Sequence, residues 1–167
     1  MKKIIIKGAS TKASFEADKP VPKRKKVFIV HGRDETLLKK VDKQLVDNGL
    51  ETIVLHRQTS NGRNIIDNLD KHTEVKTAVV LYTPDDLGKH SLDKSLQPRA
   101  RQNVIFEHGY LLAKLGRERV IMLVEGDPEI PTDVFGITYI HTSTRGWRKK
   151  LCAELIDLKV IDKCEEE

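Results

Sequence analysis

The sequence predicts an α/β fold, a flavodoxin-like three-layer sandwich around a five-stranded parallel sheet in the order 2-1-3-4-5. Two observations predict this fold. Strand-like and helix-like segments alternate from Val27 onward, and strands separated by helices pair in parallel through right-handed crossovers. The strand-like runs are also short and rich in β-branched residues, as expected of strands that helices cover on both faces. A chain of 167 residues is long enough for one such domain.

The first half of the domain contains three predicted strands and two predicted helices. The strands are Val27–Val30, Thr52–Leu55 and Thr77–Tyr82. The first helix has apolar residues at every fourth position and ends at Asn48-Gly49, which is a favourable helix terminus. The second helix is short. The apolar residues that mark the two helices are Leu37, Val41 and Leu45, and then Ile65, Ile66 and Leu69.

The second half begins with a long polar segment, Thr83 to Pro98, and a connection of that length is usually functional or mobile. A helix follows, with apolar and aromatic residues on one stripe. Two strands and a closing helix complete the domain, with Ser143 or Thr144 as the expected N-cap of that helix. The helix stripe is Val104, His108, Leu111 and Leu115, the strands are Arg119–Val124 and Ile137–Ile140, and the closing helix carries Trp147, Leu151, Leu155 and Leu158.

Charge divides the chain into unequal parts. Residues 1–26 hold nine Lys and Arg against two acidic residues, a net charge of +7, while the other 141 residues hold 21 basic and 23 acidic side chains. We therefore expect a basic flexible arm at 1–25, in which Ile4–Ile6 could form a short strand, a domain at 26–160 and an acidic tail at 161–167. A lysine run can attract nucleic acid or anionic membrane, but without interleaved aromatic residues a solvated linker is favoured.

The cysteines and the hydropathy pattern indicate the compartment. Cys152 and Cys164 are too few for a disulfide framework, which suggests a reducing cytosol. No apolar run approaches the roughly 20 residues of a membrane span, and there is no signal-peptide pattern. The sequence therefore predicts a cytoplasmic protein without a membrane partner.

Several motifs that would assign a chemistry are missing from the sequence. It contains no GxGxxG, GxxxxGK[ST], CxxC or GxSxG, and its six histidines show no HExxH spacing. We therefore expect neither a metal site nor a serine nucleophile. The topology points elsewhere, because ligands of such sheets bind at the carboxyl ends of the strands, near the switch between strands 1 and 3. That rule selects His31–Glu35, Thr83–Arg101 and the first turns of the helix that contains Glu107.

Two short segments at this switch point could bind a nucleotide. His31-Gly32-Arg33-Asp34 follows strand 1, where Gly32 would let the backbone approach a phosphate and Arg33 could pair with it. The alternative is an ordinary turn in which Asp34 helps the helix to begin. Thr83-Pro84-Asp85-Asp86 follows strand 3, and its two carboxylates could hold ribose hydroxyls or serve only as turn residues.

The segment from Arg99 to Tyr110 is the most informative. Arg99, Arg101 and Asn103 precede or begin a helix whose N-terminus should face the switch point and favour anions. Glu107 lies about one turn into that helix, where a carboxylate could stabilise a developing oxocarbenium ion. The alternative for Glu107 is a surface glutamate at the helix start. His108 is more typical of a packed or capping histidine than of a ligand or base.

At this segment the sequence resembles the bacterial TIR-like domain family, whose members are described as predicted nucleotide-binding proteins. The resemblance covers nearly all of residues 26–158 in order. The residues that carry it are Lys26 to Asp34, Gly62 to Ile66, Ala78 to Asp86, Arg99 to Gly109, Gly116 to Val120, Glu129 to Asp133, and Gly146-Trp147. One departure is His108, where members of the family more often carry Leu.

The resemblance implies a TIR-like fold and, by relation to anti-phage effectors, hydrolysis of NAD+ with self-association on activation. NAD+ would be the substrate, and no cofactor is expected. The resemblance assigns the catalytic role to Glu107. The expected substrate-binding residues are His31, Gly32, Arg33, Asp34, Thr83, Asp85, Asp86, Arg99, Arg101 and Asn103. A nucleotide sensor without turnover, or a TIR–TIR interaction module, remains the alternative.

Overall fold

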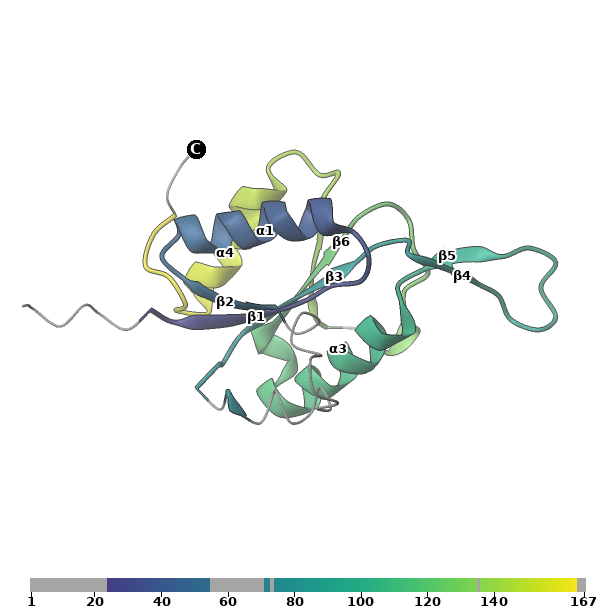
Figure 1. Ribbon diagram of the computed structural model, residues 1–167, viewed down its shortest axis with the longest axis horizontal. Coiled ribbons are helices and arrows are strands. Elements are labelled where there is room, and N and C mark those ends of the chain that lie inside the picture. Colours follow the sequence, from purple (N-terminus) through teal and green to yellow (C-terminus); the bar gives the residue numbers. More distant parts are fainter. Residues whose placement is uncertain (1–23, 55–70, 73, 135, 165–167) are drawn as a thin grey trace, which may run out of the picture.

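The computed structural model describes residues 24–54, 71–72, 74–134 and 136–164 (Figure 1). Its main sheet has five parallel strands in the order β2-β1-β3-β6-β7. Counted along this sheet alone, that order is the predicted 2-1-3-4-5, so the fold class is confirmed. The strands are β1 (Lys26–Val30), β2 (Glu51–Val54), β3 (Ala78–Tyr82), β6 (Val120–Val124) and β7 (Thr138–His141). The predicted strand Ile4–Ile6 and the predicted helix at Ile65 to Leu69 lie outside the described residues.

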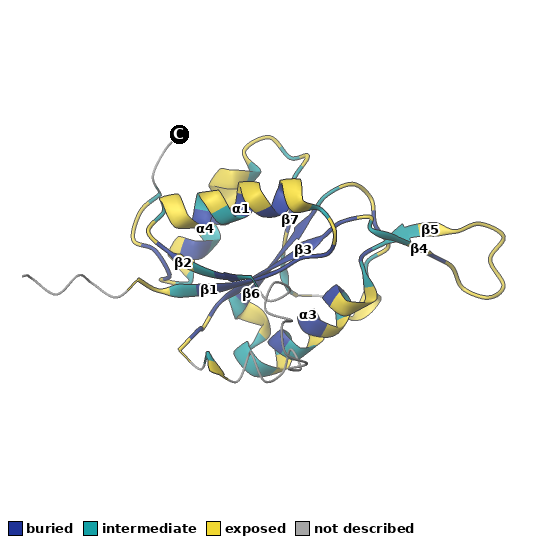
Figure 2. Cartoon of the chain, viewed as in Figure 1, coloured by how far each residue is buried: buried dark blue, intermediate teal, exposed yellow. Residues whose placement is uncertain are grey.

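Helices cover both faces of the sheet, as Figures 1 and 2 show. Helices α1 (Glu35–Asp47) and α4 (Trp147–Asp157) lie on one face, and α3 (Gln102–Leu115) lies on the other. Every residue of β3 and β6 is buried, because these strands contact side chains from both layers. Two separate apolar cores result. The core beneath α1 and α4 contains Leu37 and Leu151. The core beneath α3 contains Val104 and Leu111, and alternate residues of each strand point into the two cores.

The polar segment after β3 contains a β-hairpin, which the sequence did not predict. Strands β4 (Asp86–Gly88) and β5 (Gln97–Arg99) pair in antiparallel fashion, and the hairpin projects from the body of the domain (Figure 1). Each strand has only three residues, and most of these are polar or lack an apolar side chain, so no apolar alternation marks them. Short one-turn 3-10 helices at Arg117–Arg119 and Thr132–Val134 complete the connections.

The predicted N-cap of α4 at Ser143 or Thr144 is wrong. The helix begins at Trp147 after Gly146, which has a left-handed φ of 77° and no capping side chain. The hydroxyl of Ser143 lies 2.6 Å from His141 Nδ1, and the amide of Thr144 donates to the carbonyl of His141. Both residues therefore belong to the turn after β7, where their contacts with His141 hold them. Ser143 lies four residues and Thr144 three residues before the first residue of α4.

Cys152 and Cys164 form a disulfide. This corrects the expectation of a reducing environment, which was drawn from the small number of cysteines. After α4 the chain reverses at Lys159, the described non-glycine residue with a left-handed φ, and Val160 and Ile161 pack into the core. This reversal brings the Cα atom of Cys164 to 5.9 Å from that of Cys152. Residues 161–164 of the predicted tail therefore pack against the domain. No helix in the described ranges is long and apolar enough to span a membrane.

Candidate active site

The loops that follow β1 and β3 lie at the same end of the sheet, together with the first turn of α3 (Figure 1). This arrangement follows from the parallel register, in which Val30 lies beside Val80. His31 and Thr83, the first residues after these strands, are buried. The three segments that the topological rule selected are therefore neighbours in the structure.

Gly32 and Asp85 are in direct contact across the two loops. A Cβ atom built on Gly32 would lie 1.6 Å from Asp85 Oδ2, so a larger residue would displace the carboxylate. Thr83 holds that carboxylate in place, because its hydroxyl donates to Asp85 Oδ2 at 2.8 Å. Gly32 is thus required for close approach, but the group that approaches its backbone is the Asp85 side chain.

Arg33, Asp86 and Arg99 form a second group of charges at the base of the hairpin. Arg33 Nε lies 3.9 Å from Asp86 Oδ1, and Asp86 is the cross-strand partner of Arg99. The Arg99 guanidinium lies against Gly88, where an added Cβ would come within 2.2 Å of its Cζ atom. Arg99 Nε is buried and has no hydrogen-bond partner among the described residues. Asp34 stands apart from this group, because its Oδ1 caps α1 by accepting from the amides of Thr36 and Leu37.

Glu107 is buried on the face of α3 that contacts the sheet. Its exposed fraction is 4%, and it lies between Val104 and Leu111 on the buried stripe of the helix. The alternative of a surface glutamate at the helix start is therefore wrong. Burial raises the pKa of Glu107 to about 7, and the positive charge of Arg101 opposes part of this rise. Arg101, the N-cap residue of α3, thus acts on the carboxylate electrostatically.

His108 is a packed core residue. Its Nδ1 lies 2.9 Å from the hydroxyl of Tyr82, the last residue of β3, and the two rings make an edge-to-face contact. Burial lowers the pKa of His108 to about 4 and raises the pKa of Tyr82 to about 12. Both groups are therefore neutral near pH 7, and the tautomer of His108 decides which of them donates in this hydrogen bond. His108 Nε2 is buried without a hydrogen-bond partner in the described chain.

The structure thus unites the predicted site residues in three groups. Gly32, Thr83 and Asp85 form the first, and Arg33, Asp86 and Arg99 form the second. Arg101 and Glu107 form the third at the start of α3, with Asn103 exposed on its first turn. Within the described ranges, no hydrogen bond or ion pair joins Glu107 to Asp85 or Arg33. Sequence reasoning missed Tyr82, although a tyrosine that ends a buried strand requires a hydrogen-bond partner.

Comparison with known proteins gives a family match over most of the chain. The family model described as CAP12/Pycsar effector protein, TIR domain, matches residues 26–144. The match begins at the first residue of β1 and ends just before α4. It agrees with the resemblance that the motifs of the sequence indicate.

Three relatives are similar over most of the described domain. An uncharacterized protein, YuaY, of Escherichia coli is 42% identical over 80% of this chain and 46% of its own length. Protein tirC of Dictyostelium discoideum is 35% identical over 71% of this chain and 64% of its own. CD-NTase-associated protein 12 of Sphingobacterium faecium is 28% identical over 69% of this chain and 35% of its own. The chain therefore spans less than two thirds of each relative.

The hydrogen bond between Tyr82 and His108 predicts a coupled loss of stability. Tyr82→Phe leaves a buried histidine nitrogen without a partner, so the free energy of unfolding should fall by about 1–3 kcal/mol in urea denaturation. The double variant Tyr82→Phe with His108→Leu should lose less free energy of unfolding than the sum of the losses in the two single variants. The reason is that the double variant leaves neither partner of this hydrogen bond unpaired. Additive costs in this double-mutant cycle would contradict the assignment.

Proposed function

The chain belongs to the CAP12/Pycsar effector TIR-domain family, and from this premise we propose that it cleaves the bond between nicotinamide and ribose in NAD+. The observation that carries the proposal is Glu107, a carboxylate buried on the sheet-facing side of α3 near the switch point. Strongly shifted carboxylates in such positions are typical of functional sites. We further propose a cytoplasmic role in anti-phage defence, as the family resemblance implies.

The proposed reaction requires one anionic group and no general acid. The bond between ribose C1′ and the nicotinamide nitrogen breaks, and its electron pair stays on nicotinamide, which leaves as a neutral molecule. The ribose develops oxocarbenium character, which the ionised Glu107 carboxylate would stabilise. Water then adds at C1′ and releases a proton, whereas attack from within the same molecule would give a cyclic product.

The remaining site residues would bind the substrate. Arg101 lies near Glu107 and at the N-terminus of α3, so it could pair with the diphosphate of NAD+. Arg33 and Asp86, which form a long ion pair at 3.9 Å, could separate to contact phosphate and ribose. Asp85, held by Thr83, could accept a ribose hydroxyl through its remaining lone pairs.

Self-association is the second part of the proposal, and one feature of the hairpin favours it. Leu87, Leu92 and Leu96 of the β4–β5 hairpin are exposed by 62%, 86% and 54%. Exposed leucines gathered on a projecting element are typical of an interaction surface. A purely structural TIR–TIR interaction module, the alternative function, would use the same surface and would not need Glu107.

Replacement of Glu107 tests the catalytic assignment. Glu107→Gln should reduce nicotinamide release from NAD+ by at least about 100-fold, because the amide cannot stabilise a positive charge in the transition state. Glu118→Gln, which changes an exposed carboxylate after the same helix, should leave the rate unchanged. Equal release by wild type and Glu107→Gln would sink the assignment. No release by wild type at any protein concentration would favour a nucleotide sensor.

The pKa of Glu107 predicts the pH dependence of the reaction. The carboxylate acts when ionised, so kcat/KM should rise with pH through an apparent pKa of about 7. Arg101 lowers that pKa, and Arg101→Gln should therefore move the rising limb to higher pH. Arg117→Gln, at the other end of α3, serves as the matched control. A profile that falls across this range, or that Arg101→Gln leaves in place, would contradict the role of Glu107 as an anion.

The exposed hairpin predicts a dependence of activity on protein concentration. Specific activity of the wild type should rise with concentration, and Leu92→Asn should weaken this rise while leaving thermal stability within about 0.5 kcal/mol. Val46→Asn, which changes an exposed apolar residue on α1, is the control. Oligomer size from light scattering should follow the activity. The same concentration dependence in wild type and Leu92→Asn would exclude the hairpin as the contact surface.

A further inference from the structure

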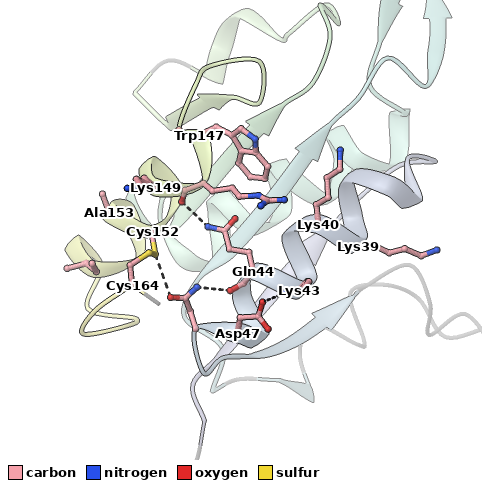
Figure 3. A pocket seen from close by; sticks show the side chains of 14 residues that line it. Lys39, Lys40, Lys43, Gln44, Asp47, Trp147, Lys149, Cys152, Ala153 and Cys164 are labelled. Carbon is pink, nitrogen blue, oxygen red and sulfur yellow. Dashed lines mark hydrogen bonds and ion pairs between the residues drawn. A yellow bond between two sulfur atoms is a disulfide. The ribbon is translucent and has the colours of Figure 1, made fainter. Parts of the chain in front are cut away.

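A cavity of about 810 Å³ lies between α1 and α4 (Figure 3). Residues of α1 and its C-cap Asn48 line one side, and Gly146, residues of α4 and Cys164 line the other. The cavity is on the opposite face of the sheet from α3 and Glu107 (Figure 1). Its volume lies within the roughly 300–1,000 Å³ of small-molecule sites, so it is large enough for a ligand of nucleotide size.

The lining of this α1–α4 cavity is strongly basic. Asp47 is the one carboxylate among the lining residues, and Lys43 Nζ already pairs with its Oδ2 at 2.5 Å. The cationic lining residues are Lys39, Lys40, Lys43, Arg148 and Lys149. Cations gathered around a concave surface raise the local concentration of anions. The α1–α4 cavity therefore favours a ligand with more than one negative charge.

The N-terminus of α4 adds to this positive field. Its N-cap, Gly146, lines the cavity and supplies no capping side chain. The first turn of α4 has no acidic residue, and Arg148, Lys149 and Lys150 occupy it instead. Cations near a helix N-terminus are unfavourable because the helix dipole is positive there. A bound anion would relieve this repulsion and would accept hydrogen bonds from the first amides of the helix.

The α1–α4 cavity also has an apolar side, which distinguishes it from a simple phosphate site. Trp147, Ala153 and Ile156 line it, and the Trp147 indole is half-buried with the Arg148 guanidinium 5.6 Å from its ring centre. Gln44 spans the helices, because its Nε2 donates to the Arg148 carbonyl at 2.8 Å. Gln44 Oε1 is buried and accepts no hydrogen bond from the described residues. A flat ring with amino or hydroxyl donors would fit this side.

We propose that the α1–α4 cavity is a second ligand site that binds a nucleoside polyphosphate. The phosphates lie among the lysines and the N-terminus of α4, and the base lies against Trp147 and Ile156. The base or ribose donates a hydrogen bond to Gln44 Oε1. This site is separate from the proposed reaction at Glu107, and its occupancy can be measured without any catalytic activity.

Trp147 makes the proposal directly testable, because it is the only tryptophan in the sequence. ATP is titrated into the protein while the indole is excited at the red edge of its band, where adenine does not absorb. We expect saturable quenching that weakens as salt is added. Lys40→Glu combined with Lys149→Glu should weaken ATP binding by about tenfold or more. Lys94→Glu, which changes an exposed lysine of the β4–β5 hairpin outside the cavity, should change it by less than about twofold.

Three further titrations separate the alternatives. Tripolyphosphate should bind more weakly than ATP because it lacks the base that lies against Trp147. Adenosine should bind more weakly still because it lacks the phosphates that the lysines contact. Glu107→Gln should bind ATP as the wild type does, which would exclude quenching from the other face of the sheet. The absence of saturable quenching by ATP would overturn the proposal. Equal affinity for ATP and tripolyphosphate, or equal loss in the Lys94→Glu control, would overturn it as well.

Discussion

The parallel pairing of β1 with β3 at the centre of the sheet is the constraint on which the candidate active site depends. The register places Val30 beside Val80, so both strands end at the same edge. The loop after β1 and the segment after β3 therefore leave the sheet together, and Gly32 meets the carboxylate of Asp85. The same pairing also positions Tyr82 so that its hydroxyl forms a hydrogen bond with His108 on α3. A change of one residue in this register would direct each of these side chains to the opposite face.

Much of the fold could be predicted from the sequence, because strands and helices differ in their apolar pattern. Runs such as Val79 to Tyr82 are apolar without interruption, and only strands buried on both faces need that pattern. The order of the sheet followed from the presence of five such strands alternating with helices, which suggests the flavodoxin-like arrangement. The hairpin at Asp86–Arg99, the start of α4 at Trp147 and the disulfide of Cys152 could not be predicted in this way. Each depends on contacts between segments that are distant in the sequence, or on a turn that competes for the same side chains.

The candidate site was predictable to a lesser extent. Topology correctly brought the loops after β1 and β3 together with the start of α3. The burial of Glu107 was left open by the sequence, although the residue lies three positions after Val104 and four before Leu111, on the stripe that faces the sheet. The hydrogen bond between His108 and Tyr82 could not be predicted from the sequence. It joins a helix to a strand, so it depends on the orientation of both elements where they pack together. The α1–α4 cavity was not predicted, because two helices distant in the sequence create it.

The free energy of folding gives an independent reason to regard the α3 face as functional. The pKa of Glu107 is about 7 in the folded chain and near 4.5 in the unfolded chain. Between these values the folded state retains a proton that the unfolded state releases, so stability falls as pH rises, by at most about 3 kcal/mol. A leucine at this position would avoid that loss. Glu107 is the one buried carboxylate among the described residues, whose other buried polar side chains belong to threonines and histidines. This carboxylate lies on α3 beside the buried His108, and a cost of this kind is typical of residues kept for binding or catalysis.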